Sequence, residues 1–104
     1  MDKVIDRAIV KYIELIRKEF DGLLDVYLFG SYAKGKSTED SDIDLALIFR
    51  SLDDSLRFDI QVQLMLLASR IDSRIEPHPL SHDDFQSGNP FIVEIKNTGI
   101  RLSA

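Results

Sequence analysis

The sequence has 104 residues, 44% of them hydrophobic and 30% charged, with a formal net charge of −5 and no cysteine. This length and composition predict a single domain over residues 1–104, with no room for a separate substrate domain. The acidic balance argues against direct nucleic-acid binding, and the missing cysteines exclude disulfides. Because no signal peptide and no bilayer-length apolar run is found, we expect a cytoplasmic protein without a membrane span.

The first half of the chain predicts one helix and two strands. Apolar residues recur at helical spacing over 4–20 and alternate with charged ones, which indicates an amphipathic helix. Residues 23–30 and 42–49 are rich in branched and aromatic side chains and predict two largely buried strands. The polar residues 31–41 between them predict a turn region with one short helical turn.

The second half begins with a helix predicted over 51–71. Ser51 and Asp54 have the spacing of a capping box, with Asp in place of the usual Glu. The helix is apolar on two sides, which leaves two interpretations: a helix sandwiched inside the fold, or a helix with one side free for a partner. The first apolar stripe is Leu56, Ile60, Leu64, Leu67 and Ile71, and the second side is Phe58, Val62, Met65 and Leu66.

The remaining residues predict a third strand and a last helix. Residues 73–80 contain two prolines, which favour a strand at a sheet edge. A helical turn capped by a serine is predicted over 81–85, and a short helix with proline in its first turn over 89–99. Residues 100–104 are a final short strand or a tail. The order α-β-β-α-β-α predicts an α/β (α+β) fold.

A Gly-Ser pair follows the first predicted strand. Gly30 lets the backbone approach a ligand closely, and a helical turn starting at Ser31 exposes N–H groups that favour an anion. The Ser31 hydroxyl adds a donor, and Lys34 and Lys36 add positive charge. Such pairs are common in turns, so this one indicates a phosphate site only together with the acids that follow.

Two aspartates open the second predicted strand. Asp42 and Asp44 are two residues apart, so in a strand their side chains project to the same face. Asp42 alone fits a residue that caps the strand entry. Asp44 stands inside an apolar run, where an unpaired charge is costly. The pair therefore predicts a divalent cation, and Mg²⁺ typically takes one or two carboxylates plus substrate phosphates.

Three further polar residues come from the third strand and its end. Glu76 points at the same metal site if its strand neighbours the second one, or acts as a base on an attacking hydroxyl. The alternative is an exposed acid on an edge strand. His78 and His82 are four residues apart but separated by Pro79, so we expect two surface histidines without a metal role.

The segment "GSYAKGKSTEDSDIDL", residues 30–45, resembles the signature of nucleotidyltransferases of the DNA polymerase β superfamily. The short length resembles the minimal nucleotidyltransferase (MNT) branch. The family often has Arg where this chain has Lys34, which keeps the charge but loses the bidentate fork. The resemblance implies a small mixed sheet flanked by helices, a nucleoside triphosphate held by Gly30, Ser31, Lys34 and Ser41, and two Mg²⁺ ions held by Asp42, Asp44 and Glu76.

The resemblance also implies an activity and a partner. It implies in-line attack of a hydroxyl on the α-phosphate of ATP, with transfer of AMP to a tyrosine of a helical HEPN-type ribonuclease toxin for which the chain is the antitoxin. A second copy of the chain is the alternative source of a completed acceptor site. Two other interpretations stay open: an antitoxin that only masks its partner, and a nucleotidyltransferase acting on a small molecule.

Overall fold

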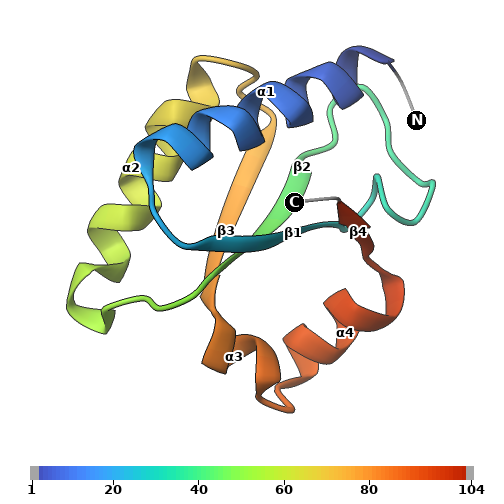
Figure 1. The fold of residues 1–104 in the computed structure, drawn as a ribbon. Coiled ribbons are helices and arrows are strands. Elements are labelled where there is room, and N and C mark those ends of the chain that lie inside the picture. Colours follow the sequence, from blue (N-terminus) through green and yellow to red (C-terminus); the bar gives the residue numbers. More distant parts are fainter. Residues whose placement is uncertain (1–2, 103–104) are drawn as a thin grey trace.

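The computed structural model describes residues 3–102 of the chain, and its strands form one mixed sheet (Figure 1). The strand order is β3-β2-β1-β4. β1 (Leu23–Phe29) pairs antiparallel with β2 (Ile43–Phe49) and with β4 (Ile100–Leu102). β2 pairs parallel with β3 (Ile75–Ser81), which lies at the edge of the sheet as its prolines predict. Residues 103–104 of the predicted tail lie outside the described part of the chain.

Helices cover both faces of this sheet, which confirms the predicted α/β (α+β) fold with a mixed sheet. α1 (Lys3–Glu19) and α2 (Arg57–Ser69) lie on one face, which we call the closed face. α3 (His82–Gln86) and α4 (Pro90–Thr98) lie on the other, which we call the open face. A 3-10 turn, η1 (Asp54–Leu56), precedes α2. Within residues 3–102, no helix is long and apolar enough to cross a bilayer.

The closed face holds the larger part of the core. Tyr12 of α1 is fully buried there, and its hydroxyl donates a hydrogen bond of 2.8 Å to the carbonyl of Leu64 in α2. Burial also raises the pKa of the Tyr12 phenol well above its usual range, so the hydroxyl stays neutral. The sheet contributes alternate residues to this core, namely Ile43, Leu45, Leu47 and Phe49 of β2.

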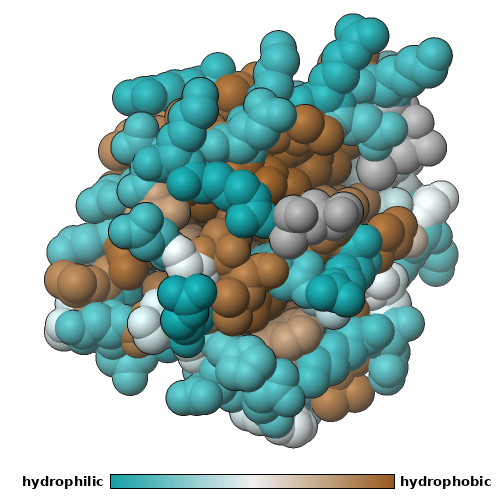
Figure 2. Space-filling view, viewed as in Figure 1, coloured by the Kyte–Doolittle hydropathy of each residue, from teal (hydrophilic) through white to brown (hydrophobic). Residues whose placement is uncertain are grey.

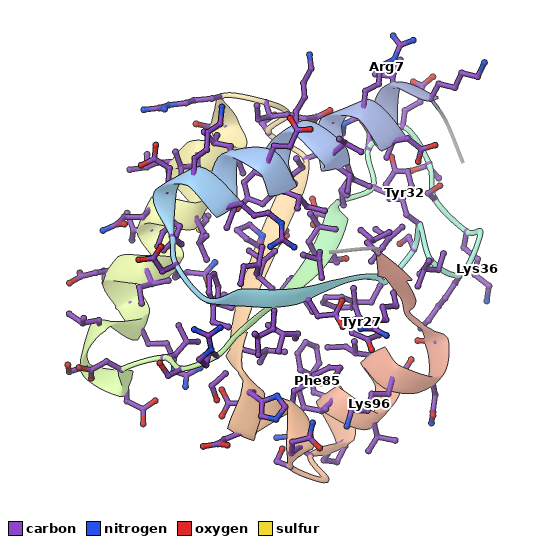
Figure 3. All side chains as sticks on the ribbon, viewed as in Figure 1. Arg7, Tyr27, Tyr32, Lys36, Phe85 and Lys96 are labelled. Atoms are coloured by element: carbon purple, nitrogen blue, oxygen red, sulfur yellow. The ribbon has the colours of Figure 1, made fainter. Side chains whose placement is uncertain are left out.

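The open face has a smaller core beneath α3 and α4. Figure 3 shows Tyr27 and Phe85 pointing toward one another in the layer between β1 and these helices, with ring centroids 5.1 Å apart. The ammonium of Lys96 lies 4.6 Å from the centre of the Phe85 ring, within the range of a cation–π contact. The core members on this face are Phe29, Ala46, Ile48, Phe85, Ile92 and Ile95.

One prediction about the second helix is wrong, and one of its two open interpretations is excluded. The chain stays extended through Asp53, and it is the Asp53 side chain that caps the 3-10 turn by accepting a hydrogen bond from the Ser55 N–H. The predicted capping box of Ser51 and Asp54 therefore does not form at the helix start. The second apolar side is not sandwiched either, because Phe58 is 77% exposed and Leu66 is 63% exposed.

Candidate nucleotide and metal site

Three carboxylates meet at the open face where β2 and β3 begin. Asp44 and Glu76 are direct partners in the parallel pairing of these strands, and Asp42 precedes β2 by one residue. The pKa of Glu76 is raised, first by the hydrogen bond that its carboxyl shares with Asp42, then by burial and by the negative charges of Asp42 and Asp44. The three predicted acids therefore lie together, and they repel each other when no cation is bound.

The alternation of β2 explains how an acid is tolerated in an apolar strand. Asp44, Ala46 and Ile48 face the open side, while the residues between them enter the closed core. Ala46 and Ile48 lie in the core beneath α3 and α4, but the Asp44 side chain remains 23% exposed. The carboxylate thus stands at the end of the open face, where the second helical layer stops.

The Gly30 turn brings the backbone against this carboxylate. Gly30 has a positive φ of 74°, which favours glycine. A Cβ added to it would lie 2.5 Å from Oδ2 of Asp44, so only glycine fits this approach. The N–H groups of Lys34 and Lys36 donate back to the carbonyls of Gly30 and Ser31, at 3.1 and 2.9 Å. The predicted turn after the first strand therefore forms, closed on itself and facing Asp44.

The other predicted nucleotide-binding residues make different contacts. The Ser31 hydroxyl has no hydrogen-bond partner among residues 3–102 and remains available to a ligand. The Ser41 hydroxyl instead accepts a hydrogen bond of 2.8 Å from the N–H of Thr38 and closes that turn. The ammonium of Lys34 lies 3.0 Å from a carboxylate oxygen of Glu94 in α4, and both side chains are exposed. Figure 3 shows Lys36 at the outer rim of the loop.

His78 belongs to this site, which the sequence analysis missed. Its Nε2 lies 3.1 Å from Oδ1 of Asp44, and its ring packs edge-on against Phe29 with centroids 5.0 Å apart. The prediction of a surface histidine holds only in part, because the side chain is 30% exposed and its ring contacts both Phe29 of β1 and the carboxylate. His82, in contrast, is exposed at the start of α3 as predicted. The two-residue spacing of Glu76 and His78 is the signal, since it puts both on one strand face.

The donor set fits a hard divalent cation that a substrate helps to hold. Within residues 3–102, no group of three acidic or histidine side chains is arranged so that the three together could hold a metal ion. Mg²⁺ does not need such a group, because it commonly uses one or two carboxylates and completes its shell with phosphate oxygens and water. Asp42 and Asp44 supply such oxygens beside the glycine turn that closes against Asp44. The site therefore fits a magnesium–nucleotide complex better than a metal alone.

A mixed sheet with paired acids on its central strand and a Gly-Ser turn opposite them is the arrangement expected of a nucleotidyltransferase fold. The sequence model of the family described as "Polymerase beta, Nucleotidyltransferase" matches residues 11–103. The chain belongs to this family, and the resemblance seen in residues 30–45 is confirmed.

Curated relatives of this chain carry the name protein adenylyltransferase. The protein adenylyltransferase MntA of Shewanella oneidensis is 37% identical over 67 residues, which are 64% of this chain and 46% of the relative. The matches to three curated relatives span between 35% and 61% of their lengths. The chain therefore corresponds to part of each of these proteins.

Two solved structures share the fold. One is the tri-AMPylated HEPN toxin of Shewanella oneidensis in complex with its MNT antitoxin (26% identity, TM-score 0.63, covering 95% of this chain and 71% of the other). The second is a toxin–antitoxin with AMP-PNP (29% identity, TM-score 0.64, covering 90% of this chain and 71% of the other).

Proposed function

We propose that the protein is an Mg²⁺-dependent nucleotidyltransferase that transfers AMP from ATP to a tyrosine hydroxyl of a HEPN-type toxin, and so acts as its antitoxin. The observation that carries this proposal is the close approach of Gly30 to the Asp44 carboxylate. Because Gly30 has no side chain, the Gly-Ser turn closes against the acid that we propose binds the metal, and the phosphate-binding groups of the turn stand beside that acid. The relatives named adenylyltransferase, and the AMPylated toxin complex, support AMP as the group transferred.

Each residue of the site has a role in this reaction. Gly30 and Ser31 hold the β- and γ-phosphates with backbone N–H groups and the free hydroxyl. Asp42, Asp44 and Glu76 hold two Mg²⁺ ions, which when bound neutralise the charge on the phosphates and lower the pKa of the attacking hydroxyl. Glu76 lies on the acceptor side and takes up the proton of that hydroxyl.

The transfer itself balances without another reactant. A bond forms between the acceptor oxygen and the α-phosphorus, and the bond from that phosphorus to the β-phosphate bridging oxygen breaks. The attacking and leaving oxygens lie roughly in line, so the protein mainly positions groups and offsets charge. The hydroxyl proton goes to Glu76 and then to solvent, and pyrophosphate is the leaving group.

Lys34 and Ser41 contribute less to ATP binding than Ser31, because both side chains already contact other residues. Lys34 reaches a phosphate only if its contact with Glu94 opens, and that exposed ion pair contributes little to stability. Ser41 acts through the Thr38–Ser41 turn that precedes Asp42, because its hydroxyl is already engaged there. We therefore expect substitution of either residue to affect affinity for ATP less than substitution of Ser31.

The test is AMP transfer with radiolabelled ATP, Mg²⁺ and a HEPN-type toxin as the acceptor protein. The expected result is label on a tyrosine of that protein, lost on addition of a chelator. Asp42→Asn with Asp44→Asn should reduce the rate at least about a hundredfold. Absence of transfer by the unmodified protein with every nucleotide and divalent metal would refute the proposal.

A second candidate function is masking of the toxin without catalysis. The observation that favours it is the exposed apolar side of α2, a surface that a partner protein could cover. Its residues are Phe58, Val62, Met65 and Leu66. The two functions differ in one growth experiment. If the Asp42→Asn, Asp44→Asn double variant protects cells from the toxin as well as the unmodified protein, masking is sufficient; loss of protection assigns the effect to transfer.

A further inference from the structure

A groove of about 420 Å³ lies at the β3 edge of the sheet, beside the carboxylate site. Phe58 and Gln61 of α2 form one wall, Phe91 of α4 forms the other, and His78 and Leu80 of β3 form the floor. Phe58 is 77% exposed and Phe91 is 43% exposed, so two aromatic rings border the opening. Neither ring is needed there to complete a core of residues 3–102.

The groove meets the carboxylate site through His78. One side of this residue lines the groove, and its Nε2 lies 3.1 Å from Oδ1 of Asp44. Phe91 packs near the same imidazole, with ring centroids 6.2 Å apart, and edge-on against Phe29 at 5.6 Å. The width of one imidazole ring therefore separates a ligand in the groove from the metal-binding carboxylate.

In-line transfer determines which substrate enters from this side. Asp44 pairs with Phe29 of β1 on one side and with Glu76 of β3 on the other. The Gly30 turn, proposed to hold the leaving pyrophosphate, follows β1. Because attacking and leaving oxygens lie opposite each other, the acceptor approaches from the β3 side. On that side the structure presents Glu76, His78 and the groove.

The lining of the groove selects the chemistry of the acceptor. Its guanidinium, Arg57, already pairs with Asp54 at 2.8 Å and Asp84 at 3.1 Å, and His78 already contacts the Asp44 carboxylate, so a phosphate group finds no unpaired basic side chain among the described lining residues. The Gln61 amide donates to the carbonyl of Pro77. What remains for a ligand is ring edges and aliphatic surface, which suit the face of an aromatic side chain.

A strip of exposed apolar side chains connects the groove to the acids along α2. Phe58, Val62 and Met65 follow one another at i, i+4 and i+7 on the helix. Met65 also lines a cavity of about 300 Å³ together with Asp42 and Glu76. Figure 2 shows hydrophobic atoms reaching the surface among hydrophilic ones on the side where α2 lies. A protein acceptor covers such a strip, whereas a small molecule does not.

We infer that this groove is the acceptor subsite, and that it binds the aromatic ring of a tyrosine presented by a partner protein. The inference rests on the proposed nucleotidyl transfer and adds to it where the acceptor lies and which residues select it. Phe58 and Phe91 hold the ring, and the phenolic oxygen passes His78 to reach the α-phosphate. His78 acts as a positioning residue for Asp44.

Binding is measured first, without any transfer. N-acetyl-tyrosinamide is titrated into the ¹⁵N-labelled full chain, with N-acetyl-leucinamide and adenosine as matched probes. Saturable shifts at the amides of Phe58, Gln61, His78 and Phe91 are expected with the tyrosine probe and not with the leucine probe. No saturable shift at these amides, or stronger shifts there with adenosine, overturns the inference.

Variants then separate the groove from the reaction. With a tyrosine-containing peptide as acceptor, Phe58→Ala and Phe91→Ala should raise its KM about three- to tenfold and leave the KM for ATP unchanged. Val93→Ala is the control, since Val93 is 44% exposed on the same helix as Phe91. Phe91→Leu keeps the apolar volume without the ring, so an equal rise in KM with a native melting curve excludes simple unfolding.

The two failures remain distinguishable. Transfer that proceeds with an unchanged acceptor KM in Phe58→Ala and Phe91→Ala overturns the groove and leaves the proposed function intact. Tyrosine-probe shifts at the groove in a protein that never transfers AMP refute the proposed function, while the binding site for the ring stands.

Discussion

The two faces of the sheet are covered to different extents, and the difference locates the candidate site. On the closed face, α1 and α2 bury every alternate residue of β2 from Ile43 to Phe49. On the open face, α3 and α4 cover Ala46 and Ile48 but leave Asp44 partly exposed. A charged group costs little where water reaches it and much where it does not. An apolar strand therefore carries an acid only at the end that the second helical layer leaves open.

Removing a core side chain from the closed face should lower the stability of the fold without altering the carboxylate site. Leu64 is fully buried between α2 and the sheet, so Leu64→Ala should lower the free energy of unfolding by about 2–5 kcal/mol. Leu66→Ala is the matched control on the same helix, where the side chain is 63% exposed and about 0.5 kcal/mol or less is expected. Urea unfolding measures both, and equal losses would contradict the division between the two sides of α2.

Adding a methyl group at the Gly30 turn should affect the open face alone. Gly30→Ala places a residue with a side chain at φ +74° and against Asp44, which should cost about 1–2 kcal/mol of stability and displace the carboxylate. Gly35→Ala is the control, because Gly35 has a φ of +70° and no atom within 4 Å of an added Cβ. We expect similar stability losses, but weaker Mg²⁺–ATP binding by calorimetry only in Gly30→Ala. Equal affinities would show that the close approach to Asp44 is unimportant for the nucleotide.

Tyr12 gives the closed face a dependence on alkaline pH. Tyr12→Phe removes the hydrogen bond to the Leu64 carbonyl and should cost about 1 kcal/mol near neutral pH. The folded-state pKa of Tyr12 is raised above the usual 10.0, so the unmodified protein should lose stability as pH rises above that value, where only the unfolded phenol ionises. Chemical unfolding at increasing pH should show a shallower loss in Tyr12→Phe. Tyr32→Phe, whose hydroxyl bond is exposed, should leave the slope unchanged.

Asp84 gives the open face a dependence on acid pH. Its pKa is lowered, first by the Ser81 N–H that donates to its carboxylate and further by the Arg57 guanidinium. The stabilisation is therefore present above the usual aspartate pKa of 3.8 and is lost as pH falls through the lower folded-state value. Asp84→Ala should cost about 1 kcal/mol at neutral pH and little in strong acid. The exposed neighbour Asp83 is the control, and an equal pH slope in Asp83→Ala would contradict this assignment.

The sequence was sufficient for the elements and for the acids of the site. Except at the start of α2, hydrophobic periodicity and capping residues predicted the helices and strands, because these signals depend on neighbours in the chain, as at Ser81 and Pro90. The same-face spacing predicted that Asp42 and Asp44 lie together. Glu76 was predicted to join them only if its strand neighbours the second one, and the pairing of β2 with β3 fulfils that condition. The roles of these carboxylates in metal and nucleotide binding stay predictions.

What the sequence did not reveal depends on contacts between distant segments. The contact of His78 with Asp44 requires the parallel register of β2 and β3, which no local pattern specifies. The sequence shows that α2 is apolar on two sides, but periodicity alone does not show whether the second side is buried by another element or exposed. The start of α2 was misplaced because Ser51 and Asp53 are equally good caps, and the extended backbone at Asp53 decides between them.

The pairing of β3 with β2 determines which backbone N–H and C=O groups of this edge strand point into the sheet and which point outward. In a parallel pair, alternate residues direct their N–H and C=O groups to the partner strand. The N–H of Ile43 in β2 donates to the carbonyl of Arg74 at 2.8 Å, so the even-numbered residues of β3 face β2. The odd-numbered residues direct theirs outward, away from the sheet.

None of these outward positions offers a free N–H. Ile75 donates to the carbonyl of Asp72, Ser81 donates to the carboxylate of Asp84, and Pro77 and Pro79 have no N–H at all. A strand from another molecule therefore finds no donors with which to extend the sheet, and this edge resists the pairing that leads proteins to aggregate. At this edge, a partner molecule can therefore contact the site through its side chains but cannot bind by adding a strand to the sheet.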